Sequence, residues 1–269
     1  MTPQQFRILV WRHFRKEGRH DLPWRTTTDA YRILVSEVML QQTQVERVVP
    51  FYLAFLKKFP TVRKLADASL SSVLQSWQGL GYNRRAKMLH EAAKTVVRDY
   101  HGKMPTDSAI LESLPGVGPY TARAVAAFSA NTDSIFIETN IRTAVTHHFF
   151  GDREQVADAE VIAVLEQAYP KGRAREWYAA LMDYGSFLKR SGVRVNARAK
   201  GYAKQKSFAG SAREARGRIL KALIDSPKTT HILTSQLGPE RKEQMKAQLA
   251  ALAAEGLIER KGEKYQLPG

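Results

Sequence analysis

The sequence predicts a mainly α-helical protein with a small α+β module at its C-terminal end. Apolar residues recur at helical spacing from about residue 31 to about residue 189, which is typical of helices that each bury one face. After residue 255, apolar and polar residues alternate around a turn at residues 261–262, which indicates a β-hairpin. With 269 residues and 43% hydrophobic content, the chain can form one large domain or two smaller ones.

The expected helices follow one another with short connections. Residues 31–59 should form two helices divided near Val49 and Pro50, because proline interrupts helical hydrogen bonding. The same periodicity predicts further helices over residues 69–78, 84–100, 140–150, 158–168 and 175–189.

A helix–hairpin–helix is expected over residues 111–130. Its turn contains Gly116 and Gly118, which permit backbone angles that a side chain would disfavour. The second helix, over residues 120–130, would begin with N–H groups that can bind a phosphate. An acid, Glu138, follows some twenty residues later, and this combination suggests chemistry on a nucleic acid.

The C-terminal part has a different composition. Residues 189–211 are basic and poor in large aliphatic residues, so we expect a linker that is either a solvated connector or a direct DNA contact through Lys200 and Lys204. Residues 212–269 should form a separate domain of three helices and a terminal hairpin, which is the winged-helix pattern. Such a domain either contacts DNA or serves dimerisation or protein docking.

The charge of the chain favours nucleic acid as its partner. The net charge is +16, and residues 187–269 hold 18 Lys and Arg against 7 Asp and Glu, a net of +11. Lysine and arginine that neutralise phosphates release counterions, which drives binding, although a merely soluble or ribosome-associated basic protein is an alternative. The chain has no cysteine, which excludes disulfides, thiolate catalysis, cysteine-ligated zinc and ordinary iron–sulfur clusters.

Membrane association is not expected. No apolar run approaches the length of a membrane span, and residues 1–25 lack a signal-peptide pattern. We therefore expect a cytoplasmic protein, nucleoid-associated in a bacterium, that acts as a monomer.

Four motifs together resemble a known family. They are LPWR at residues 22–25, SEVMLQQTQ at 36–44, GLGY at 79–82 and LPGVGPYTA at 114–122. On these motifs the chain resembles the helix–hairpin–helix (HhH-GPD) DNA glycosylases, and most closely the adenine DNA glycosylases of the MutY type. The resemblance implies a two-lobed helix–hairpin–helix glycosylase fold over residues 1–188, with a central lobe at 28–130 and a second lobe formed by 1–27 and 131–188.

The implied activity is monofunctional hydrolysis of the N-glycosidic bond of a base flipped out of double-stranded DNA that contains a mispaired or damaged base. Adenine opposite 8-oxoguanine or guanine is the first expectation. Thymine or uracil mispaired with guanine is the enzymatic alternative, and a non-catalytic protein that binds damaged DNA is the alternative from another class.

Glu37 is the first candidate catalytic residue. It lies in an apolar helix between Val35 and Val38, where burial would raise its pKa and suit it to act as a general acid. The resemblance implies that it protonates the purine ring of the extruded adenine. A structural acid paired with Arg47 or Arg85 is the alternative.

Glu138 is the second candidate, at the position where the family has a catalytic Asp that stabilises positive charge on the deoxyribose. Here the acid is one methylene longer, and Thr139 replaces the family's Gly. Asn140 matches the family's Asn, which orients the carboxylate. The alternative role for Glu138 is an acid that complements the dipole at a helix N-terminus.

Tyr120 stands where bifunctional glycosylase-lyases such as endonuclease III carry a Lys that forms a Schiff base with the sugar. A tyrosine cannot form that bond. We therefore expect base removal without efficient strand cleavage.

The resemblance also implies a set of DNA contacts. Gln41, Gln42 and Thr43 would wedge beside the extruded nucleotide, and Tyr82 lies in a second intercalating turn; the alternative for each is a surface helix cap or turn residue. The hairpin amides of Gly116, Val117 and Gly118 would bind a phosphate. Arg84 and Arg85 either contact phosphates or form a solvated face. The hairpin carbonyls of Leu114 and Val117 would bind a monovalent cation, Na⁺ or K⁺, and no cofactor is expected to be essential.

The chain departs from typical MutY proteins in two further respects. The four-cysteine iron–sulfur motif should follow Leu188, and the basic linker stands there instead. The domain that recognises 8-oxoguanine is replaced by the winged-helix candidate, so the opposite base does not follow from the resemblance.

Overall fold

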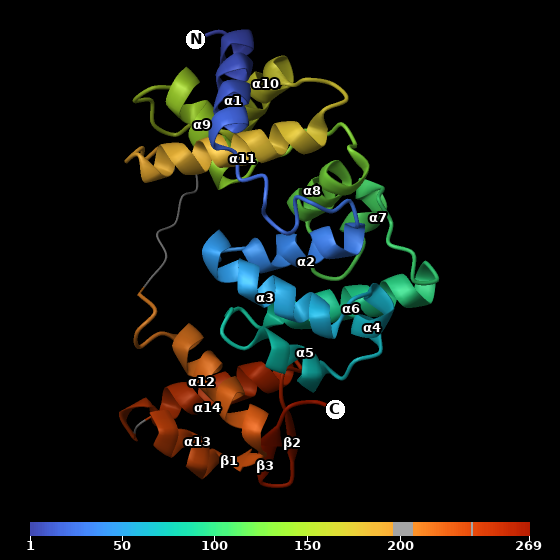
Figure 1. The fold of residues 1–269 in the computed structure, drawn as a ribbon. Helices are drawn as coiled ribbons and strands as arrows, with labels where there is room; N and C mark the ends of the chain where they lie inside the picture. Colours follow the sequence, from blue (N-terminus) through green and yellow to red (C-terminus); the bar gives the residue numbers. More distant parts are fainter. Residues whose placement is uncertain (196–206, 238) are drawn as a thin grey trace. The chain divides into compact units, whose positions relative to one another are not determined.

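The computed structural model describes residues 1–195, 207–237 and 239–269, and it is mainly helical with one small sheet near the C-terminal end (Figure 1). Contacts within the chain define two compact units, each built from segments that are distant in sequence. Unit 1 consists of Met1–Glu37, Pro105–Ser113 and Val117–Lys204, and unit 2 of Val38–Met104, Leu114–Gly116 and Gln205–Gly269.

These compact units are not the expected domains, whose boundaries stay a prediction. The C-terminal module, defined as residues 212–269, belongs to the same compact unit as residues 38–104. Its main chain joins theirs directly, since the N–H of Ser71 donates to the carbonyl of Pro268 over 3.2 Å. Both helices of the hairpin, Ser108–Glu112 and Pro119–Ala130, belong to unit 1, where they contact each other and the second also contacts the helix Ala174–Arg190.

Unit 1 is a helical bundle. Its helices are α1 (Pro3–Glu17), α7 (Ser108–Glu112), α8 (Pro119–Ala130), α9 (Thr139–Phe149), α10 (Asp158–Ala168) and α11 (Ala174–Arg190), together with most of α2 (Ala30–Leu40). Helix α11 contacts α1, α8 and α9, so it lies at the centre of this bundle (Figure 1). The core contains Phe6, Ile141, Leu165 and Trp177, whose side chains are inaccessible to solvent.

Local sequence signals set several helix ends in unit 1. Thr2 and Gln5 form a capping box in which each side chain accepts the main-chain N–H of the other, and Pro3 follows at the first helical position. Helix α8 ends at Asn131, whose φ of 54° is left-handed, a conformation that asparagine tolerates at helix ends.

Unit 2 joins four helices of the first half of the chain to the C-terminal module. The four helices are α3 (Val45–Lys58), α4 (Val62–Ala66), α5 (Leu70–Trp77) and α6 (Arg84–Asp99). They pack around Phe55 and Trp77, whose rings meet edge to face with centroids 5.8 Å apart.

The C-terminal module contains helices and a three-stranded sheet. Its elements are α12 (Ala212–Asp225), β1 (Lys228–Thr229), α13 (Thr230–Leu237), the 3₁₀ turn η2 (Pro239–Arg241), α14 (Lys242–Ala254), β2 (Glu259–Lys261) and β3 (Lys264–Gln266). The expected terminal hairpin is confirmed, with Arg260 opposite Tyr265. The sheet order is β1-β3-β2, all antiparallel, and strand β1 was not expected because two residues are too few to show an alternating pattern.

The division of residues 31–59 was expected at the wrong place. The chain breaks at residues 41–44, between α2 and α3, and Gln42 has a left-handed φ of 55° there. Pro50 lies inside α3, one turn beyond its start and exposed. Among the described residues, no helix is long and apolar enough to cross a membrane.

Candidate active site

Glu37 is a buried acid with a neutral partner. It lies in α2 with 6% of its surface exposed, and the hydroxyl of Tyr120 donates to its Oε2 over 3.1 Å. Burial raises the pKa of the Glu37 carboxyl to about 7, against the opposing effects of the Tyr120 hydrogen bond and the charge of Arg25. A carboxyl with this pKa is about half protonated at neutral pH and can act as a general acid.

Glu37 does not pair with Arg47 or Arg85, which was the alternative to a catalytic role. Arg47 donates to the carbonyl of Gly79, and Arg85 donates to several other main-chain carbonyls. In the described part of the chain, the hydrogen-bond partner of Glu37 is Tyr120.

Glu138 has the opposite surroundings, because donors surround its carboxylate. It is the N-cap of α9, where Oε1 accepts the main-chain N–H groups of Asn140 and Ile141 over 2.7 and 2.8 Å. Its Oε2 accepts the side chains of Asn140 over 3.0 Å and Thr139 over 3.1 Å. An ionised carboxylate offers about four acceptor sites, so these donors hold a negative charge in a fixed position.

The structure brings Glu37, Tyr120 and Glu138 together in unit 1. The charge of Glu138 adds to the raised pKa of Glu37. Burial raises the pKa of Tyr120 far above its usual range, and the charges of both acids raise it further. Lys189 also interacts with Glu138. The charge of Glu138 raises the pKa of the Lys189 ammonium group, but burial has the larger effect and lowers it.

Gly185 allows α11 to approach the start of α9. A Cβ at this position would lie 1.9 Å from the main-chain oxygen of Asn140, which is too close for any side chain. The first turn of α9, and with it the Glu138 carboxylate, therefore depends on a glycine at this position.

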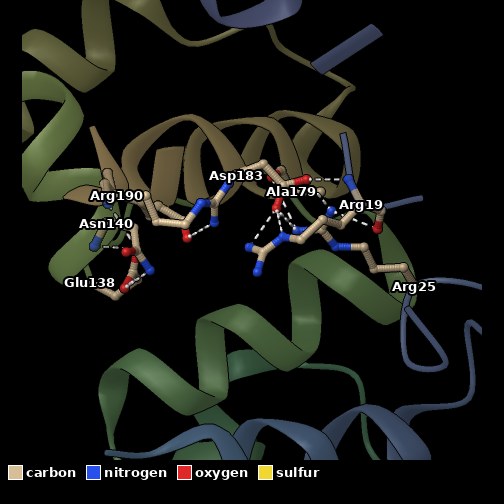
Figure 2. A network of polar contacts seen from close by, with 9 residues as sticks. Arg19, Arg25, Glu138, Asn140, Ala179, Asp183 and Arg190 are labelled. Atoms are coloured by element: carbon tan, nitrogen blue, oxygen red, sulfur yellow. Dashed lines mark hydrogen bonds and ion pairs between the residues drawn. The ribbon is translucent and has the colours of Figure 1, made fainter. Parts of the chain in front are cut away.

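A second buried acid, Asp183, lies on α11 and is 2% exposed (Figure 2). The guanidinium of Arg19 donates to Oδ1 over 2.7 Å, and Arg25 of the LPWR motif donates to both carboxylate oxygens. Burial raises the pKa of Asp183, but the hydrogen bond with Arg25 and the charges of Arg25 and Arg19 outweigh it, and the net pKa is lowered. This network joins the segment before α2 to α11.

The residues expected to wedge into the base stack lie at the break between α2 and α3. Gln42 is exposed, and Gln41 and Thr43 are half-buried. Arg85 lies among them, because its guanidinium donates to the carbonyls of Val38, Met39 and Gln41 over 2.8, 3.0 and 2.6 Å. These bonds use an arginine to satisfy the last carbonyls of α2, which gives Arg85 a structural role, and its expected phosphate contact stays a prediction.

Tyr82 and Arg84 are both at the surface of unit 2. Tyr82 is 37% exposed and has a left-handed φ of 48°, which is unusual for a bulky residue and favoured at functional turns. Arg84 is exposed at the first position of α6, and its phosphate contact stays a prediction.

The hairpin glycines have different roles from each other. Gly116 has a φ of 74°, and a Cβ there would lie 2.4 Å from the Cβ of Met88, so both conformation and space require glycine. Gly118 has an ordinary extended φ of −93°, so the expectation of a special angle was wrong at this position. A Cβ at Gly118 would meet nothing within 4 Å, which leaves room at the start of α8.

The remaining expected residues are Leu114 and Val117, whose side chains are buried, and Lys200 and Lys204, which lie outside the described residues. Within the described ranges there is no group of three or more His, Asp or Glu side chains that could hold a metal ion.

Sequence reasoning missed three residues that shape the site. Asp183 carries the signal that pointed to Glu37, an acid inside an apolar helix, and could have been found in the same way. Thr139 departs from the family's Gly, but the sequence does not show that its hydroxyl donates to Glu138. Gly185 gave no signal, because a glycine within a helix does not reveal which main chain approaches it.

Several known proteins are similar to this chain in sequence. The family model described as "HhH-GPD superfamily base excision DNA repair protein" matches residues 35–171. A protein named adenine DNA glycosylase from Mycolicibacterium smegmatis is 36% identical over 295 residues, which cover 100% of this chain and 97% of that protein. One from Mycobacterium tuberculosis is 39% identical over 186 residues, but these are 66% of this chain and 59% of that protein.

Solved structures show the same fold at lower identity. A thermostable thymine-DNA glycosylase has a TM-score of 0.62 at 24% identity, covering 73% of this chain and 94% of that one. Endonuclease III in a non-covalent complex with DNA has a TM-score of 0.56 at 20% identity, covering 76% and 91%. The family match, the alignment over the whole chain and the shared fold agree, and this protein belongs to the HhH-GPD superfamily of base excision DNA repair proteins.

Proposed function

We propose that this protein is a monofunctional DNA glycosylase that removes adenine from a mispair, opposite 8-oxoguanine or guanine. The observation that carries the proposal is the pairing of Glu37, whose pKa is about 7, with the fixed carboxylate of Glu138. The name of the Mycolicibacterium smegmatis relative, which the chain matches over 97% of that protein's length, supports adenine as the base.

Glu37 would supply the proton. Its protonated carboxyl donates to a ring nitrogen of the flipped adenine, and the bond between C1′ and the base then breaks with its electron pair on the base. Burial keeps a useful fraction of Glu37 protonated at neutral pH, although the hydrogen bond from Tyr120 favours the ionised carboxylate.

Glu138 would stabilise the positive charge that develops on the sugar. A preorganised charge needs no rearrangement during the reaction, and here four hydrogen bonds hold it in place. Water then adds at C1′ and releases a proton to solvent. Because its acceptor sites are occupied, Glu138 acts as a fixed charge and not as the acceptor of that proton.

Tyr120 supports hydrolysis without strand cleavage. It donates to Glu37 and carries no amine that could attack C1′, so the chain offers no Schiff-base nucleophile at this position.

Double-stranded DNA is the proposed partner. The net charge of +16 favours phosphate binding, and the fold of a DNA-bound endonuclease III is shared. The arrangement of α12, α13, α14 and the β2–β3 hairpin supports a winged-helix assignment for the C-terminal module. The neutral hairpin carbonyls of Leu114 and Val117 suit a monovalent cation, which we propose as a structural ligand that raises the melting temperature in K⁺.

Single-turnover assays test this function. Purified protein is incubated with duplexes that carry adenine opposite 8-oxoguanine, adenine opposite guanine, thymine opposite guanine, or uracil opposite guanine. Release of adenine, with strand cleavage only after alkali, is the expected result. Release of thymine or uracil would favour the other enzymatic assignment, and tight binding with no release from any duplex would indicate a non-catalytic damage-binding protein.

A further inference from the structure

Arg213 of the C-terminal module contacts Tyr82, and both residues belong to unit 2. The Nη1 of Arg213 donates to the hydroxyl of Tyr82 over 2.9 Å, and its guanidinium carbon lies 5.9 Å from the centre of the ring. The guanidinium of Arg85 lies 5.4 Å from the same ring. Tyr82 therefore meets two arginines that come from segments more than a hundred residues apart.

The helix that carries Arg213 is fixed to unit 2 by further polar contacts. Arg216 is three residues along α12, on the same face, and forms a bidentate ion pair with Glu255 over 2.9 and 2.6 Å. The main-chain carbonyl of Glu255 accepts from Lys87 of α6. Because α6 begins two residues after Tyr82, these contacts hold the start of α12 beside that tyrosine.

The turn at residues 79–82, which we call the Tyr82 turn, needs such support. Gly79, Gly81 and Tyr82 all have left-handed φ values, of 104°, 76° and 48°. Arg47 and Arg85 donate to main-chain carbonyls in this turn, while Arg213 donates to the tyrosine hydroxyl. Glycine adopts such angles at little cost, but in a bulky residue such as Tyr82 they persist only where neighbouring groups hold them.

We propose that the C-terminal module and the Tyr82 turn form one DNA-reading surface, in which Arg213 is the positioning residue that holds Tyr82 ready for insertion beside a mispair. This inference rests on the proposed function, which places a mispaired duplex at Tyr82. A side chain that is already fixed in its bound conformation loses less entropy on binding, so the contact should increase affinity for the mispaired duplex.

A double-mutant cycle tests the proposal in the full chain. Arg213→Ala, Tyr82→Phe and the double variant are made in a Glu37→Gln background, which keeps the substrate intact. Dissociation constants are measured for a duplex with adenine opposite 8-oxoguanine and for a matched duplex. We expect Arg213→Ala to weaken mispair binding about tenfold, and this loss to fall below about threefold when Tyr82 already lacks its hydroxyl, as for two residues in contact.

Lys221→Ala is the matched control, because it removes one exposed positive charge from the same helix and should change both affinities slightly and equally. Arg213→Lys, which retains the charge, replaces the alanine variant if that variant melts early. It should also lose mispair affinity, because lysine does not reproduce the guanidinium contact with Tyr82. Equal losses for Arg213→Ala in the two Tyr82 backgrounds, or a loss no larger than that of Lys221→Ala, would overturn the inference.

The two proposals fail in different ways. If the wild-type protein releases adenine and the cycle shows no coupling, the function stands and the role of Arg213 is lost. If no duplex loses a base, the proposed function fails, and the reading surface built on it fails with it.

Discussion

Glu37 and Asp183 are two nearly inaccessible acids of the same unit, 6% and 2% exposed, and they differ in their partners. Asp183 contacts two guanidinium groups, whereas Glu37 contacts a neutral hydroxyl. The net pKa is lowered at Asp183 and raised to about 7 at Glu37. One acid is thus a permanent ion that joins two segments, and the other is suited to donate a proton. Burial alone does not assign a role to an acid; its partner does.

Of the substitutions that test this difference, Glu37→Gln should have the largest effect on activity. Loss of the general acid should lower the single-turnover rate of adenine release about a thousandfold. Duplex affinity should be retained, as measured by fluorescence anisotropy. Retained activity would remove Glu37 from its proposed role.

The same substitution should also increase stability above neutral pH. The pKa of Glu37 is higher in the folded state, so its stabilising contribution is complete below its unfolded pKa of about 4.5 and is lost as pH rises through about 7. Glutamine removes that loss, which amounts to about 3 kcal/mol. Equal urea midpoints for the two proteins at high pH would contradict the buried, partly protonated carboxyl.

Asp183→Asn should destabilise the fold by about 3–5 kcal/mol, because it leaves Arg19 and Arg25 without their shared counter-charge. Because the pKa of Asp183 is lowered, the wild-type contribution is present above its unfolded pKa and is lost only as pH falls through the lower folded value. Asp99→Asn is the control, since Asp99 pairs with Arg98 at the surface and its loss should leave the denaturation midpoint unchanged. Similar midpoints for the two variants would show that the buried network is dispensable.

Glu138→Asp tests whether the longer acid is required. The shorter side chain would draw the carboxylate back by about 1 Å from its position, which should lower the rate about a hundredfold. Glu138→Gln, which keeps the length and removes the charge, separates position from charge. An aspartate variant faster than wild type would mean that the longer acid is only a poor substitute for aspartate.

Gly185→Ala should have the smallest of these effects, a loss of about 1–3 kcal/mol in the free energy of unfolding, because its Cβ would meet the main chain of Asn140. The displaced first turn of α9 should also lower the rate of base release more than the duplex affinity. Gly217→Ala is the control, because a Cβ there meets nothing and should stabilise α12 by about 0.5–1 kcal/mol. If the two alanine variants are equally stable, the close approach of α11 to α9 is not tight.

Some of these features could be predicted from the sequence alone, and others could not. Helical periodicity predicted most helices and the terminal hairpin, because each element shows its own pattern. The same reasoning from an acid in an apolar helix applied equally to Glu37 and Asp183, and only the family motif favoured Glu37. Which arginine pairs with which acid depends on contacts between segments 158 residues apart, as for Arg25 and Asp183, and no local pattern encodes that.

Contacts between distant segments also explain the misplaced helix break. The break after α2 lies at Gln42 and not at Pro50, because Arg85 of α6 satisfies the final carbonyls of α2. The C-terminal module was expected as a separate domain, and the contacts of Lys87 and Ser71 with it are visible only once the chain is folded.

The pH dependence of adenine release tests the protonated state of Glu37 most directly. Single-turnover rates of the wild-type protein should be nearly constant below about pH 7 and fall about tenfold for each further pH unit, as the Glu37 carboxyl loses its proton. The slow residual reaction of Glu37→Gln should lack this fall. A wild-type rate that stays constant or rises between about pH 7 and about pH 9 would contradict the assignment of Glu37 as the proton donor.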